Sequence, residues 1–150
     1  AVVVDTPTAD VPAVIATDAY KIQAEGLIAA LDAKKEDAHV LRMADELTQT
    51  GLSMLPALVK AYPECKEYLG AIEAVGLTLK DMSLEEIEAG YHTDGKLPTM
   101  PSAECYHGKD LVVHPGTVAA LAKAGLSTDE QRSQARAEIA EVLEHLGAVK

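Results

Sequence analysis

The sequence predicts an all-α protein, an antiparallel bundle of five to six helices with an extended N-terminal arm and a long irregular loop near 90–114. Ala and Leu are frequent and runs of β-branched residues are few, which favours helices. Apolar residues recur at helical spacing, and capping motifs and short connections separate these stretches. With 150 residues, 48% of them hydrophobic and 25% charged, the chain is expected to form a single helical domain over 1–150.

The N-terminal segment differs from the rest of the chain. Residues 1–16 carry Pro7 and Pro12 among Val, Thr and Asp, which predicts an extended arm that lies on the helical body. The composition becomes helical at Asp18, and we expect helices throughout 17–89.

Local signals divide this helical region. A helix that begins near Asp37 contains Pro56, which lacks a backbone donor and predicts a kink or a break. Pro63 is well placed to open the next helix. Ser83 and Glu86 have the spacing of a capping box, in which each side chain accepts from the other residue's backbone N–H, so we expect a short helix to begin there.

The last third contains the irregular loop and a helical hairpin. Several Gly and Pro residues fall within 90–114, which predicts a segment without regular structure. We expect a hairpin over 115–146, in which Pro115 opens the first helix and Ser127 with Glu130 caps the second.

Charge limits the classes of partner. The chain has 13 Lys and Arg against 24 Asp and Glu, a formal net charge of -11, so the attraction to phosphate backbones needed for nucleic-acid binding is missing. No stretch approaches the ~18 consecutive apolar residues of a membrane helix, and we expect no membrane insertion. The acidic surface remains available to a protein partner.

Two cysteines, Cys65 and Cys105, lie on well separated segments. The chain begins at Ala1 with no basic leader before an apolar block, as in a mature exported protein, and we expect a periplasmic or secreted location and a Cys65–Cys105 disulfide. The alternative is a cytoplasmic protein with two free buried thiols.

The loop also concentrates groups that ligate metals. His107, Asp110 and His114 are spaced so that one helical face could present all three, and His92 could supply a further ligand. Imidazole and carboxylate together suit Zn, Cu, Ni or Fe. Gly108 weakens a helix here, so the competing interpretation makes His114 the N-cap of the next helix and leaves the histidines as surface or capping groups.

Haem is a less favoured cofactor, since no Cys-x-x-Cys-His attachment motif is present. A noncovalent haem would need one methionine and one histidine as axial ligands. The candidates are Met43, Met54, Met82 and Met100, with His39 or His145. His145 also has a simpler explanation, because an imidazolium is favoured in the last turn of a helix.

These observations predict an exported, non-catalytic protein that binds a metal ion or a metal cofactor for storage, delivery or electron transfer. An enzyme is less favoured, because the pairing of Cys105 with His107 or His92 is the one Cys/His arrangement to consider and a disulfide would abolish it. The alternative is a ligand-free structural or interaction subunit of a larger assembly.

Overall fold

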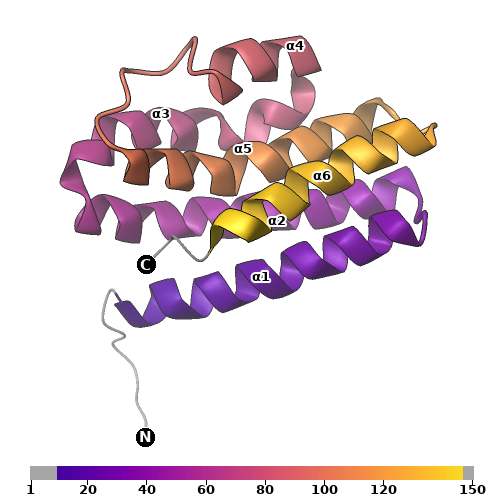
Figure 1. Ribbon diagram of the computed structural model, residues 1–150, viewed down its shortest axis with the longest axis horizontal. Helices are drawn as coiled ribbons and strands as arrows, with labels where there is room; N and C mark the ends of the chain where they lie inside the picture. The colour runs from indigo at the N-terminus through magenta and orange to yellow at the C-terminus, as the bar shows by residue number, and fades with distance from the viewer. Residues whose placement is uncertain (1–9, 147–150) are drawn as a thin grey trace, which may run out of the picture.

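The computed structural model describes residues 10–146, with side chains from residue 17 onward, and it is an all-α bundle without strands over that range (Figure 1). The elements in chain order are α1 (Asp10–Asp32), α2 (Asp37–Ala61), the 3₁₀ turn η1 (Pro63–Cys65), α3 (Lys66–Val75), the 3₁₀ turn η2 (Gly76–Asp81), α4 (Leu84–Ile87), the π-helical turn η3 (Glu88–His92), α5 (Ala103–Ala124) and α6 (Asp129–His145). No helix in this range has the length and apolar character needed to cross a membrane.

Helix α5 is the central element of the bundle. It contacts α2, η2, α6, α3 and α4, and every residue from Gly108 to Ala122 is buried. A helix that is covered on all sides normally carries apolar residues all round. Polar side chains are nevertheless buried along it: Lys109, Asp110, His114 and Thr117.

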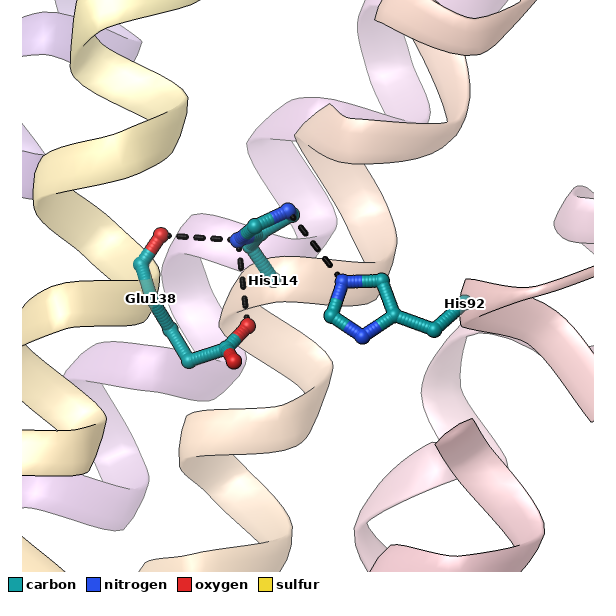
Figure 2. Close-up of side chains that lie close together, drawn as sticks. All are labelled: His92, His114 and Glu138. Carbon is teal, nitrogen blue, oxygen red and sulfur yellow. Dashed lines mark hydrogen bonds and ion pairs between the residues drawn. The ribbon is translucent and has the colours of Figure 1, made fainter. Parts of the chain in front are cut away.

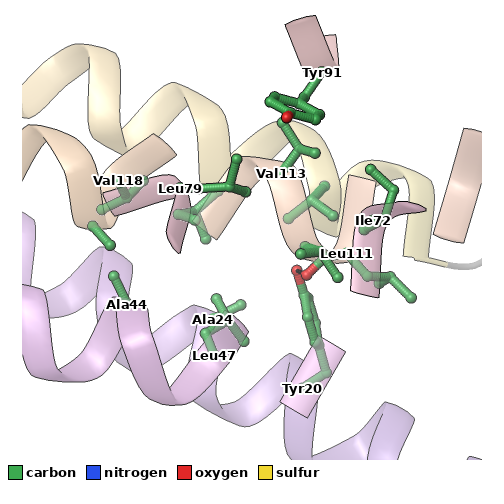
Figure 3. Packing of buried hydrophobic residues seen from close by; sticks show 14 of the residues in the cluster. Tyr20, Ala24, Ala44, Leu47, Ile72, Leu79, Tyr91, Leu111, Val113 and Val118 are labelled. Atoms are coloured by element: carbon green, nitrogen blue, oxygen red, sulfur yellow. Dashed lines mark hydrogen bonds between the residues drawn. The ribbon is translucent and has the colours of Figure 1, made fainter. Parts of the chain in front are cut away.

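The core around α5 is built from aliphatic side chains and two fully buried tyrosines, Tyr20 and Tyr68. Figure 3 shows Tyr20 reaching from α1 to the backbone of α5, where its hydroxyl donates to the carbonyl of Leu111 at 2.9 Å. Leu111 lies four residues before Pro115, which has no N–H to donate to that carbonyl. The tyrosine therefore supplies the hydrogen bond that the proline removes.

This contact corrects the prediction that Pro115 opens a helix. α5 begins twelve residues earlier, at Ala103, and passes through Pro115 without a break. Gly108 also lies inside α5, where the absence of a side chain lets Leu69 pack against the helix. A Cβ at this position would lie 2.9 Å from the Leu69 side chain. The irregular segment is consequently shorter than the predicted 90–114 and covers residues 93–102.

Two further boundaries differ from the predictions. α1 already includes residues 10–16 of the predicted arm, because Pro12 lies in the first helical turn, where no intrahelical N–H bond is lost. The rest of the predicted arm, residues 1–9, lies outside the described residues. The capping box of α6 uses Thr128 and Gln131, one residue later than predicted, whereas the Ser83–Glu86 box of α4 is confirmed.

Candidate metal centre

Helix α5 presents three of the predicted ligands on one face. His107, Asp110 and His114 are spaced three and four residues apart within one continuous helix, so their side chains project in similar directions. His114 is 0% exposed and Asp110 is 1% exposed, whereas His107 is half-buried. His114 lies in the middle of α5, which excludes the alternative role as an N-cap.

His92 reaches this face from the π-helical turn η3. The N–H of Thr93 donates to the Glu88 carbonyl at 2.9 Å, the five-residue spacing of a π-helix, and such turns are frequent at functional sites. The Nδ1 atom of His92 lies 3.0 Å from the Glu88 carboxylate, so its Nε2 atom faces inward. This Nε2 atom is 3.4 Å from the Nε2 atom of His114 (Figure 2).

A buried lysine holds the His92 turn against α5. Lys109 is 1% exposed, and its ammonium donates to the His92 carbonyl and to the Asp94 carboxylate, both at 2.8 Å. The Tyr68 hydroxyl donates to the same Asp94 oxygen at 2.7 Å. These hydrogen bonds hold the backbone of His92 in place without a bound ligand.

Helix α6 supplies the other side of the centre. The Nδ1 atom of His114 donates to the backbone carbonyl of Glu138 at 2.8 Å, and the Glu138 carboxylate lies 3.0 Å from the same nitrogen. Glu141 has a carboxylate oxygen 3.6 Å from the Nε2 atom of His114. Farther along α6, the Nδ1 atom of His145 lies 3.5 Å from Asp110.

These carboxylates change the protonation of His114. Burial alone lowers the pKa of an imidazole, but the contacts with Asp110, whose Oδ1 lies 3.3 Å away, and with Glu138 outweigh burial and raise the pKa of His114 to about 10. Without a bound ion, His114 is therefore an imidazolium at neutral pH. An environment that attracts this positive charge also attracts a metal cation.

Several buried polar atoms at the centre have no hydrogen-bond partner within the described residues. They are both carboxylate oxygens of Asp110, Oε1 of Glu138 and the Nδ1 atoms of His107 and His145. The carboxylates are close enough to the imidazoles for charge attraction but are not aligned for hydrogen bonds. An unsatisfied buried polar group costs about 1–3 kcal/mol, so these atoms would gain from a bound ligand.

The donor geometry suits a metal ion. His92, His114 and Glu138 each offer one ligand atom, and these atoms lie within 4.8 Å of one another. Two nitrogens bound to a tetrahedral zinc ion at about 2.0–2.1 Å are about 3.3–3.4 Å apart, which matches the separation of the two Nε2 atoms. The contacts of His92 with the Glu88 carboxylate and of His114 with the Glu138 backbone carbonyl resemble the outer-shell contacts that orient ligating histidines.

A groove connects this centre with solvent. It runs between α4 and η3 on one side and α6 on the other, with Thr117 of α5 among its lining residues. His92 and Glu138 also line it. An ion thus has an entry path to two of the three proposed ligands.

Sequence reasoning found part of this centre. His92 and Asp110 both meet His114, as the hypothesis of a shared site required, whereas His107 lies closer to His145, with ring centroids 6.3 Å apart. Glu138 and Glu141 were missed as ligands, and His145 was considered only as an axial ligand of haem. Their spacing of three and four residues repeats that of His107, Asp110 and His114, and this repeat was the available signal.

The predicted Cys65–Cys105 disulfide is confirmed, with the two Cα atoms 5.3 Å apart. It ties the turn η1 to the first turn of α5, two residues before His107. The bond therefore fixes the end of α5 that carries the candidate ligands.

Searches against protein families, curated proteins and solved structures found no match, so the functional interpretation depends on the geometry of this centre.

Proposed function

We propose that this protein binds a transition-metal ion through His92, His114 and Glu138. The observation that carries the proposal is the facing pair of Nε2 atoms, 3.4 Å apart, beside a carboxylate that completes a compact set of three donors. Two imidazoles and one carboxylate suit zinc or iron(II), and copper and nickel also accept imidazole nitrogen. Haem stays the less favoured cofactor, because two of its candidate axial ligands are poorly placed. His145 faces Asp110, and Met54 is buried in the core.

The proposed role is storage, delivery or electron transfer rather than catalysis. Three protein ligands leave a fourth position on a tetrahedral ion for water or for a ligand from another molecule. The groove beside His92 and Glu138 gives such a ligand access. An ion that can exchange ligands without unfolding the protein suits delivery in particular.

We also propose that the protein acts in an oxidising compartment, the periplasm or the cell exterior. The Cys65–Cys105 disulfide supports this location, since disulfides persist outside the reducing cytoplasm. A bound ion in that compartment would be acquired or released outside the cytoplasm.

A ligand-free structural subunit is the second candidate. The observation in its favour is the His114 imidazolium between Asp110 and Glu138, which forms ion pairs with both carboxylates without a metal. In this case the centre would hold α5 against α6 and no more.

Metal titration distinguishes the two candidates. Chelator-treated protein is titrated with Zn, Cu, Ni and Fe ions, and bound metal is measured by elemental analysis after desalting. We expect tight uptake by the wild type, and at least a hundredfold weaker uptake by His92→Ala and Glu138→Gln. His39→Ala is the matched control, because His39 lies on α2 and contacts Arg42 instead.

Circular dichroism confirms that each variant is folded, and the conservative Glu138→Gln keeps the test valid if an alanine variant does not fold. Equal, adventitious uptake by the wild type and by all folded variants would overturn the metal proposal and favour the structural subunit.

A further inference from the structure

A second group of donors lies next to the proposed ion site, toward the N-terminus of α5 and the C-terminus of α6. His107 and Asp110 come from α5, and His145 comes from α6. The ion proposed at His92, His114 and Glu138 does not require any of the three as a ligand. Their unsatisfied buried atoms, Nδ1 of each histidine and both oxygens of Asp110, still require an explanation.

The two helices contribute matching patterns. α5 carries donors at 107, 110 and 114, and α6 carries donors at 138, 141 and 145, with the same spacing. His114 meets Glu138 at one end, and His107 meets His145 at the other, so the two helices run antiparallel along this face. Antiparallel packing therefore gives the polar face two ends, each with imidazole and carboxylate within reach.

Asp110 lies between these ends. Its Oδ1 atom is 3.3 Å from the Nε2 atom of His114, and its Oδ2 atom is 3.5 Å from the Nδ1 atom of His145. The two oxygens of one buried carboxylate thus face a different histidine each. This is the arrangement that a carboxylate needs to bridge two metal ions.

We propose that the centre binds two metal ions, with Asp110 as the bridging ligand and with His107 and His145 holding the second ion. This inference rests on the proposed function, since it adds an ion to the first site. Paired ions that share ligands in proteins lie about 3.5–4 Å apart. Carboxylate and histidine residues that face one another in a helical bundle are an established way of holding such pairs.

The second site is more open than the first. The rings of His107 and His145 are 6.3 Å apart, against 5.0 Å for His92 and His114, so the second ion must draw its ligands together. The His145 side chain is 41% exposed, which gives that ion direct access to solvent. We therefore expect the second ion to bind more weakly than the first, by at least tenfold.

Copper(II) titration of the folded, disulfide-bonded protein tests the inference, with stoichiometry from elemental analysis and ion proximity from electron paramagnetic resonance. We expect the wild type to bind two ions in two steps and to show magnetic coupling at the second. His145→Ala should bind one ion and show no coupling. Asp110→Asn should lose the coupling, and His39→Ala should behave as the wild type.

Each outcome bears on a different claim. One ion in the wild type, with His145→Ala unchanged, would overturn the second site and leave the first intact. Two ions without coupling would overturn the bridging role of Asp110. No specific binding by the wild type would overturn both this inference and the proposed function.

Discussion

The two faces of helix α5 are packed in opposite ways. On the face toward α1 and α2, the backbone of α2 at Gly51 lies close to the backbone of α5 at Leu111. The Leu111 carbonyl, which Pro115 leaves without a backbone donor, accepts a hydrogen bond from Tyr20. On the face toward α6, charged groups are buried and several of their atoms have no hydrogen-bond partner among the described residues. Both faces belong to the same helix, so helix propensity does not distinguish them.

The contrast separates stability from function. Buried ion pairs contribute little net stability compared with apolar packing, because both charges must lose their hydration. The face toward α2 therefore holds the bundle together, and the face toward α6 carries the buried polar groups that we propose as metal ligands.

The largest effect is expected from the disulfide, which fixes the end of α5 that both faces share. The double variant Cys65→Ala/Cys105→Ala should lower the free energy of unfolding by about 4 kcal/mol, because the unfolded chain regains the entropy that the cross-link removes. Urea denaturation of the variant and the wild type measures this. An unchanged free energy of unfolding would contradict it, and two freely titrating thiols in protein from its native compartment would contradict the proposed location.

The second largest loss of stability is expected from a methyl group added between α2 and α5. A Cβ on Gly51 would lie 2.2 Å from the backbone oxygen of Leu111, an atom that cannot move aside without shifting the helix. We expect Gly51→Ala to lower the free energy of unfolding by about 3 kcal/mol. Gly70→Ala is the matched control, since a Cβ at that helical position meets nothing within 4 Å and should be neutral or stabilising.

If urea denaturation gives the two glycine variants the same free energy of unfolding, the close approach of α2 to α5 is wrong.

The tyrosine hydrogen bond should have a smaller effect on the same face. Tyr20→Phe leaves the Leu111 carbonyl with neither the tyrosine hydroxyl nor a proline N–H as donor, so we expect a loss of about 2 kcal/mol. Thermal and urea unfolding measure the loss. Tyr62→Phe serves as the control, because within the described residues no hydrogen bond of the Tyr62 hydroxyl is found. If Tyr62→Phe loses as much stability as Tyr20→Phe, the Tyr20 hydroxyl does not compensate for Pro115.

The face toward α6 should respond to pH. Because the pKa of His114 is raised to about 10, an ion must displace a proton from this imidazole at neutral pH. Metal affinity should rise about tenfold, or 1.4 kcal/mol, for each pH unit between 7 and 9. Calorimetry in buffers of different ionisation enthalpy counts the released protons, and uptake without proton release would show that His114 is not a ligand.

The metal-free protein should show the opposite trend. A folded-state pKa above the unfolded value of 6.5 stabilises the protein fully below about pH 6.5, and this contribution is lost as pH rises toward 10. The difference in unfolding free energy between the wild type and His114→Gln should therefore shrink over that window. A constant difference from pH 6 to 10 would contradict the charged state of His114.

Signals that lie within a few residues of each other predicted the fold class and many of its details. The capping box of α4 needs only Ser83 and Glu86, so it could be predicted directly. The continuity of α5 could not, because Pro115 is tolerated through a hydrogen bond between Tyr20 and Leu111, 91 residues apart. Whether a helix-breaking residue ends a helix can thus be predicted only when its distant partners are known.

The same limit applied to the candidate metal centre. His92, Asp110 and His114 could be proposed because their residue types and spacing are typical of ligands. Glu138 required the knowledge that α5 extends back to Ala103 and lies antiparallel to α6. The sequence predicted an irregular loop up to residue 114, so a continuous α5 face was not expected there. Without that face, the matching spacing of residues 138, 141 and 145 on α6 could not be recognised.

An anomalous-diffraction experiment can locate the metal ion that we propose between α5 and α6. Crystals grown with zinc are measured on both sides of the zinc absorption edge, which locates the ion independently of any activity. We expect an anomalous peak about 2.0–2.1 Å from the Nε2 atoms of His92 and His114 and beside the Glu138 carboxylate. Zinc found only at exposed groups such as His39, with no peak between α5 and α6, would contradict it.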